Sequence, residues 1–363
     1  MKGKLGDLVL GSACGGIALA LLFCSPAAGE GIRQGLAVCA SVMIPSLYPF
    51  LILSDFVART RLGRLLERAF GGVAERLYRC PRALAPAILM SWLGGYPAGA
   101  RVLAGMAERG TLTREEAGRA LTFCVNSGPA FLAAVVGAGV FGSPKWGLFL
   151  FACQLAAGAL TGRLLCRGYR WRRLDAGEER GYLPPAAGFV GAVTSATGGM
   201  LSICAFVLVF SALSRLLAGW GLLGAWGAGL SRLTGGILTP GGAVCFLTGL
   251  LEVGGGCALA QGLPPGQGAL ALPFVLSFSS LSVICQLAAC FGETGVDGGL
   301  LLRARVLHGG LTLLLAGPVL WARFWAAPAM TGQPVLAPGS GGLLWALCVM
   351  AMVTILCTAV EGG

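Results

Sequence analysis

Ten apolar runs recur along this chain, and they constrain its fold more than any other feature. A helix needs about 20 apolar residues to span a bilayer, and each run is close to that length. Only 11% of the residues are charged, whereas ordinary soluble domains have roughly 25%. The runs are Leu8–Cys24, Leu36–Ala58, Ala83–Met106, Ala117–Phe141, Trp146–Cys166, Gly188–Leu217, Gly235–Ala260, Ala269–Phe291, Leu300–Trp321 and Leu343–Thr358. The sequence therefore predicts an all-α polytopic membrane protein.

The first run has two interpretations. It follows Lys2 and Lys4 and ends before the small residues 25–29, a pattern shared by cleaved signal peptides and first transmembrane helices. Because the chain downstream is apolar throughout, we interpret the run as a transmembrane anchor.

Neither the cysteines nor the positive charge indicates a cofactor, a metal or nucleic acid. The fourteen cysteines are scattered, mostly within apolar runs, with no C-x-x-C pair, so we expect small buried side chains. The net charge of +11 comes from arginines that flank the apolar runs. Such arginines are topology signals in membrane proteins.

The placement of these charges predicts how often the chain crosses the membrane. If all ten runs cross, the Lys and Arg residues outside them divide 14 against 11. If Ala83–Met106 and Gly235–Ala260 instead turn back within the bilayer, they divide 20 against 5, with Arg303 and Arg305 on the majority side. Cytoplasmic loops concentrate Lys and Arg. We therefore predict about eight transmembrane helices, two re-entrant helical hairpins and cytoplasmic N- and C-termini.

Both proposed hairpins contain the residues that a tight turn needs. Gly94–Pro97 and Gly254–Gly256 offer glycines, which adopt positive φ, and a proline, which lacks an N–H donor. A turn inside the bilayer is tolerated only where protein or a watery cavity covers its unpaired backbone. The alternative is a kinked continuous helix that packs through small residues.

The order of elements is the same in the two halves of the chain. Each half has an opening helix, an amphipathic stretch, a hairpin and a helix interrupted by polar residues, at 126–129 and at 277–282. The stretch 59–82 fits either a helix on the membrane surface or an ordinary loop helix. With eight crossings the halves face opposite ways. Interrupted segments in an inverted repeat are typical of a transporter's midplane binding site.

Four motifs resemble a known family. GGYPAGAR (94–101), the segment 111–131, GLLEVGGG (249–256) and SFSSLSV (277–283) resemble the YlbJ-type sporulation integral membrane proteins, which are grouped with nucleoside-recognition Gate domains. The resemblance implies an architecture related to concentrative nucleoside transporters. It also implies a role in spore formation, in the outer forespore membrane of endospore-forming bacteria, with dipicolinic acid as the cargo.

These observations divide the chain into five parts. They are an N-terminal transmembrane helix (1–34), a first Gate-like repeat (35–166), a basic cytoplasmic loop (167–185), a second inverted Gate-like repeat (186–322), and a C-terminal loop with a transmembrane helix (323–363). The hairpins are expected at 83–108 and 235–262, and the broken helices at 117–141 and 269–292.

Arg101 and Glu252 are the leading candidate site residues. A cation inside an apolar segment costs on the order of 3 kcal/mol, so Arg101 should face a polar cavity or a partner. Its guanidinium suits a carboxylate, and where the family often has lysine the charge is preserved. Glu252 is the deepest acid in any apolar run, apart from Asp55 near a helix end. It could carry a coupling proton, or simply pair with Arg101.

The remaining candidates lie at the turns and breaks. Gly95 and Tyr96 lie at the first hairpin turn, where the tyrosine would stack on an aromatic cargo or act as a gate. Asn126, Ser127, Ser279 and Ser280 lie at the helix breaks, where such side chains replace lost backbone hydrogen bonds and can also contact a ligand. His308, the only histidine, fits a packing role better than a proton relay.

The sequence as a whole favours a secondary carrier of a small anionic metabolite. It has no ATP-binding motif, and no nucleophile–base pattern that would indicate an enzyme. The expected partners are the anionic cargo, the lipid bilayer, a coupling proton or sodium ion, and further copies of the chain. A nucleoside-type cargo and a non-transporting scaffold for spore-envelope assembly are the alternatives.

Overall fold

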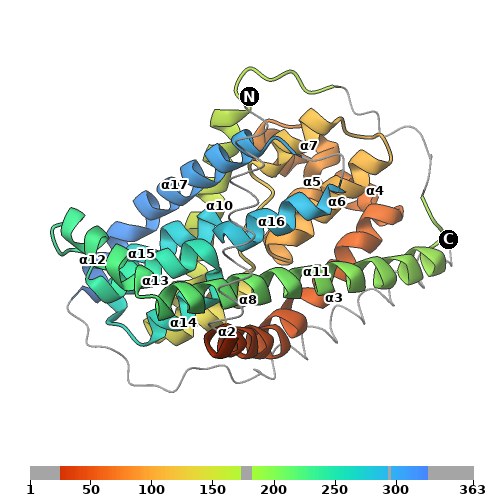
Figure 1. Ribbon diagram of the computed structural model, residues 1–363. Helices are drawn as coiled ribbons and strands as arrows, with labels where there is room; N and C mark the ends of the chain where they lie inside the picture. The colour runs from red at the N-terminus through yellow and green to blue at the C-terminus, as the bar shows by residue number, and fades with distance from the viewer. Residues whose placement is uncertain (1–24, 173–181, 293–295, 326–363) are drawn as a thin grey trace, which may run out of the picture.

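Helices form all the regular secondary structure in the part of the chain that the computed structural model describes, which is residues 25–172, 182–292 and 296–325 (Figure 1). The expected crossings Leu8–Cys24 and Leu343–Thr358 lie outside this part. Five of the described helices are long and apolar enough to span a membrane. They are Pro26–Arg59, Pro144–Leu165, Pro185–Gly219, Pro265–Cys290 and Gly298–Phe324. The prediction of an all-α, multi-pass membrane protein is confirmed.

The first long helix is continuous but irregular. It consists of α2 (Ser25–Val38), a π-helical turn (Cys39–Met43) and α3 (Ile44–Arg59). The π-turn immediately precedes Pro45 and Pro49, which cannot donate to the helical hydrogen-bond ladder. Residues 26–34, which the sequence assigned to a first crossing, therefore continue directly into α3.

The rest of the first half consists of shorter helices followed by a long one. In order they are α4 (Leu62–Val73) with a π-turn (Ala74–Tyr78), a 3-10 turn (Arg82–Leu84), α5 (Ala85–Leu93), α6 (Tyr96–Glu108), α7 (Arg114–Leu121), α8 (Pro129–Phe131), a π-helical segment (Leu132–Ala138), α9 (Gly139–Phe141) and α10 (Pro144–Leu165).

The second half has the same order of parts. Its helices are α11 (Pro185–Gly219), α12 (Leu222–Leu233), α13 (Pro240–Leu251), α14 (Val253–Gln261), α15 (Pro265–Phe278), α16 (Ser280–Cys290) and α17 (Gly298–Phe324). In both halves a long helix leads to a shorter one, then to a pair of short helices, a broken helix and a long helix.

The short helix pairs are too short to cross a bilayer individually. Helices α5, α6, α13 and α14 have 9, 13, 12 and 9 residues. At 1.5 Å per residue, none reaches the about 30 Å of a hydrocarbon core. The first pair turns at Gly95, whose φ is 81°. Glycines also let the partners approach: a Cβ on Gly256 would lie 2.5 Å from the Cα of Gly249.

The start of α7 is fixed by a buried acid. Glu116 accepts from Thr113 N (2.8 Å) while its own N–H donates to Thr113 Oγ1 (3.1 Å), and Arg172 Nη2 donates to the same carboxylate (3.1 Å). Burial acts to raise the pKa of Glu116, but hydrogen bonds from Arg172 and Thr113 outweigh it and hold that pKa below its usual range. The charged carboxylate thus ties α7 to the segment after α10.

The two halves interlock through their broken helices. Helix α7 belongs to a core with α5 and α6, and that core is completed by Val283 and Leu287 of α16. Conversely, Leu132 and Val136 after the first break lie in the core formed with α15 and α17. Each broken helix therefore contributes one part to its own half and the other part to the opposite half.

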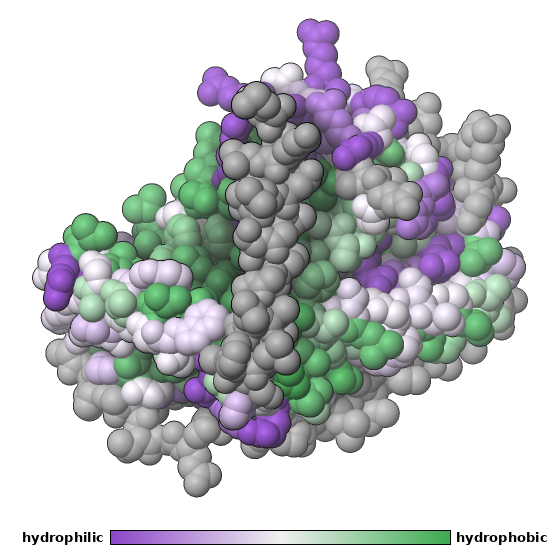
Figure 2. Space-filling model, in the orientation of Figure 1, coloured by the Kyte–Doolittle hydropathy of each residue, from purple (hydrophilic) through white to green (hydrophobic). Residues whose placement is uncertain are grey.

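The long helices flank these cores. Helix α11 runs along α2 and α3, and α17 packs against α15 and α10 (Figure 1). Figure 2 shows hydrophilic residues gathered around α7 at the top of the view and hydrophobic surface across much of the middle. This distribution suits a molecule embedded in a membrane with one polar end at its surface.

Close backbone packing yields a first prediction. A Cβ on Gly147 of α10 would overlap the backbone carbonyl of Leu132, so Gly147→Ala should destabilise the fold by about 1–3 kcal/mol, as overpacking does. Gly229→Ala in α12 is the matched control, because a Cβ there meets nothing within 4 Å. Thermal unfolding of the detergent-solubilised protein measures both, and equal melting temperatures for the two variants would contradict this packing.

Candidate functional site

A buried arginine lies where the two broken helices meet. Arg305 of α17 is fully buried; its Nη2 donates to the carbonyl of Thr122 (2.7 Å), and its Nη1 donates to the carbonyls of Val125 (2.8 Å) and Ser277 (3.4 Å). Helix ends leave such carbonyls without donors, and a guanidinium supplies several N–H groups and a favourable charge there. The assignment of Arg305 to a cytoplasmic loop is wrong, because the residue lies inside α17.

His308 holds this arginine in place. Its Nδ1 lies 3.2 Å from Arg305 Nη1, and its Nε2 lies 2.9 Å from the carbonyl oxygen of Gln154. Because a guanidinium only donates, Nδ1 must accept and Nε2–H must donate to Gln154, which makes the ring neutral. His308 therefore has the structural role that its sequence context predicts.

The turn of the first helix pair contacts both breaks. The Tyr96 hydroxyl contacts Ser127 Oγ of the first break and donates to the carbonyl of Leu276, just before the second (2.6 Å). Ser127 Oγ and Gln154 Nε2 donate to the same carbonyl, at 3.2 and 3.3 Å. A Cβ on Gly95 would lie 3.4 Å from Gly128 N. Three predicted site residues, Gly95, Tyr96 and Ser127, are thus brought together.

The other break residues bond locally. Asn126 Nδ2 donates to Ser91 Oγ (3.1 Å) and to the Phe123 carbonyl (3.3 Å). Ser279 Oγ donates to the Ser277 carbonyl (3.3 Å), and Ser280 Oγ accepts from Val283 N (3.4 Å). Ser279 and Ser280 are fully buried at φ of 80° and 63°, values that non-glycine residues rarely adopt. Their hydroxyls support the distorted backbone of the second break.

Glu252 lies apart from Arg101. Its carboxylate oxygens accept from Gly254 N (2.9 Å) and Gly255 N (2.6 Å), so it caps α14 from the turn of the second helix pair. The cap satisfies two of the free N–H groups at that helix end. The sequence-based alternative of a pair between Arg101 and Glu252 is therefore not what the structure shows.

Arg101 instead pairs with Asp55. Its Nη1 lies 3.1 Å from Asp55 Oδ2, and its Nη2 donates to the Ser195 carbonyl (3.2 Å). A Cβ on Gly199, one turn after Ser195, would overlap the guanidinium. The arginine thus links α6 to α3 and α11. Asp55 was missing from the predicted site, although it is the other acid in an apolar run.

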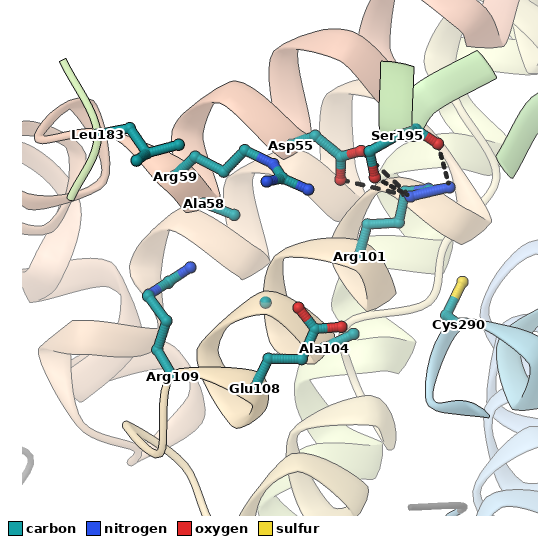
Figure 3. Close-up of a pocket in the computed structure, with 11 residues that line it drawn as sticks. Asp55, Ala58, Arg59, Arg101, Ala104, Glu108, Arg109, Leu183, Ser195 and Cys290 are labelled. Atoms are coloured by element: carbon teal, nitrogen blue, oxygen red, sulfur yellow. Dashed lines mark hydrogen bonds and ion pairs between the residues drawn. The ribbon is translucent and has the colours of Figure 1, made fainter. Parts of the chain in front are cut away.

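This ion pair lines a cavity of about 250 Å³. Figure 3 shows Arg59 and Arg109 on the opposite side of the same space from Arg101. Among the described residues, neither Arg59 nor Arg109 has a carboxylate within ion-pair distance. The lining comprises Asp55, Ala58, Arg59, Arg101, Ala104, Gly105, Glu108, Arg109, Leu183, Ser195 and Cys290. Unpaired guanidinium groups beside a cavity of this size are suited to bind a small anion.

One known protein shares most of the length of this chain. Over 308 residues it is 27% identical to the sporulation integral membrane protein YlbJ of Bacillus subtilis (strain 168), and the match covers 77% of this chain and 74% of that protein. The resemblance to YlbJ-type sporulation membrane proteins is confirmed. No protein-family model and no solved structure matches the chain. The Gate-domain grouping therefore stays a prediction from the motifs.

Removing the buried guanidinium should unfold the centre of the molecule. Arg305→Met leaves the carbonyls of Thr122 and Val125 without donors, at about 1–3 kcal/mol each. We expect little monodisperse protein after detergent extraction. Arg303→Met is the control, because Arg303 lies one half-turn away on the same helix and is exposed. Equal yields and melting temperatures for the two variants, measured by size-exclusion chromatography and thermal unfolding, would show that Arg305 has no such role.

A milder change tests the contact between the first turn and the breaks. Tyr96→Phe removes the donor to Leu276, and a lost buried hydrogen bond costs about 1–3 kcal/mol. Tyr48→Phe is the control, because the Tyr48 hydroxyl bonds Thr197 Oγ1 (2.8 Å) at an exposed site. Chemical or thermal denaturation should rank Tyr96→Phe clearly below Tyr48→Phe in stability. The reverse order would contradict the geometry.

Proposed function

We propose that this protein is a secondary carrier of a small anionic metabolite, and that dipicolinate is its cargo in the outer forespore membrane during sporulation. The observation that supports this most directly is the cavity lined by Arg59, Arg101 and Arg109. The similarity to a sporulation integral membrane protein supports the cellular setting. Dipicolinate itself comes from the family resemblance of the sequence motifs.

The proposed topology has eight crossings and two re-entrant hairpins in an inverted repeat, with both termini in the cytoplasm. The helix pairs α5–α6 and α13–α14 are too short to cross singly, and each connects through a tight turn. Their repeated order and the interlocked broken helices support this arrangement. In such repeats the cargo site lies where the interrupted helices meet.

The electrostatics favour a negative cargo. Arg305 places a fixed positive charge at the centre, where among the described residues no acid lies within ion-pair distance of it. The guanidinium groups of Arg59 and Arg109 add charge at the cavity. Planar guanidinium groups can hold carboxylates through two parallel hydrogen bonds, so a dicarboxylate could engage more than one of them.

In the proposed cycle, α6 moves relative to α3 and α11. The cavity lies between these helices and the end of α16, so a shift of the first hairpin would open or close it. The chain's lack of an ATP-binding motif leaves an ion gradient or the cargo gradient as the driving force. A proton or sodium ion is the proposed coupling ion, and assembly into a homo-oligomer is also part of the proposal.

Uptake of radiolabelled dipicolinate into liposomes that contain the purified protein tests this function. Arg59→Gln and Arg109→Gln each remove a cation that has no carboxylate partner, so folding should survive. A lost charge-assisted hydrogen bond corresponds to about a tenfold or larger rise in KM. Arg114→Gln is the matched control, because Arg114 is exposed and outside the cavity.

The alternatives predict different results. A nucleoside-type carrier would transport labelled nucleosides and leave dipicolinate outside, whereas a scaffold would transport neither. Unchanged KM values in both Arg59→Gln and Arg109→Gln would move the cargo site away from this cavity.

A further inference from the structure

The carboxylate of Asp55 occupies the place on Arg101 that an anionic cargo would take. It contacts only Nη1 of the guanidinium, at 3.1 and 3.5 Å from its two oxygens. A cargo carboxylate could form two parallel hydrogen bonds, which are stronger and more directional than this one-sided contact. Asp55 is therefore an internal competitor that an incoming anion can displace.

We propose that Asp55 is the group that couples proton movement to anion transport: cargo displaces it from Arg101, and the freed carboxylate takes up one proton. This inference rests on the proposed carrier function. It moves the coupling role from Glu252, whose carboxylate is held by the backbone of its own hairpin, to a residue in the wall of the cavity.

The burial of Asp55 makes the proton necessary. Asp55 is 5% exposed, and a buried carboxylate that loses its cation is strongly disfavoured in the charged form. A proton from water on the side where the cargo enters bonds to a carboxylate oxygen and neutralises it. When the cargo leaves, Arg101 returns to Asp55 and the proton departs. No other covalent bond forms or breaks.

The groups around Asp55 are consistent with this exchange. Arg101 faces it from α6 and Arg59 from its own helix, and both favour its charged form. Ser195 approaches it from α11, and the thiol of Cys290 from α16 completes the charged and titratable surroundings. Of these groups, only Arg101 contacts the Asp55 carboxylate as an ion pair. Its release therefore decides whether Asp55 is charged.

The same contact prevents a proton leak. While Arg101 holds the Asp55 carboxylate, the acid has a cation partner and no reason to bind a proton. Because this ion pair also ties α6 to α3, its breakage frees the first hairpin at the moment when cargo and proton are both bound. Cargo binding, proton uptake and hairpin release are thus linked through one guanidinium.

Calorimetry of dipicolinate binding tests the inference directly. Binding to the purified protein is measured at neutral pH in two buffers that differ in ionisation enthalpy, which gives the number of protons taken up. The wild type should take up about one proton per dipicolinate, as a single freed carboxylate requires. Asp55→Asn should take up none and should bind several-fold more tightly, because the internal competitor has lost its charge.

Several results would overturn the inference. They are dipicolinate binding to the wild type without proton uptake, weaker binding in Asp55→Asn, and loss of proton uptake in Glu252→Gln together with its retention in Asp55→Asn. Glu115→Gln, an exposed acid on α7, is the control and should match the wild type. Should Asp55→Asn fail to fold, the wild-type proton count decides alone.

A second measurement separates this inference from the carrier function. Liposomes loaded with a pH-sensitive dye report whether protons enter with labelled dipicolinate. Uptake with acidification supports the inference, whereas uptake without acidification contradicts it and leaves the carrier role standing. If the folded wild-type protein neither binds nor transports dipicolinate, the carrier proposal itself fails, and the inference fails with it.

Discussion

The fold depends on the capture of broken-helix carbonyls by one buried guanidinium. A helix that stops in the middle of a membrane protein exposes carbonyl oxygens that water would normally satisfy. Arg305 donates to such oxygens from both broken helices at once, and Tyr96 and Gln154 donate to the neighbouring carbonyl of Leu276. The positive charge is stabilised by the negative ends of helices instead of by a carboxylate. This arrangement lets two interrupted helices meet at the centre without leaving their backbone ends unpaired.

The two hairpins differ in how their turns are stabilised, although their order in the chain is repeated. The first turn is connected to the surrounding structure, since Tyr96 reaches both breaks and Arg101 reaches Asp55 and Ser195. The second turn is largely self-contained, because Glu252 caps the helix that follows it. A movement of the first hairpin therefore breaks contacts with several elements. The second hairpin can move as a unit with its cap intact.

Local features of the structure could be predicted from the sequence, but the long-range pairings could not. The glycines before Tyr96 and the polar run after Leu276 indicate a turn and a break, because their backbone preferences are encoded in neighbouring residues. Arg305 looks like a topology signal, since it follows Arg303 and its carbonyl partners lie in distant parts of the chain. Asp55 lies near a helix end, and nothing local shows that Arg101 will face it. Charge counting thus identified which runs turn back, but it could not distinguish a surface arginine from one buried in the core.

The interlocking of the broken helices has a consequence for biosynthesis. Helices α5, α6 and α7 complete their core only when α16 arrives, and the segment after the first break completes its packing only against α15 and α17. During translation the first half must therefore wait in the membrane with its apolar contacts unfilled until most of the second half has been inserted. The repeat is not a pair of modules that fold one after the other. Quality control by membrane proteases would act on this waiting intermediate, and late truncations would endanger the whole chain rather than its last helices alone.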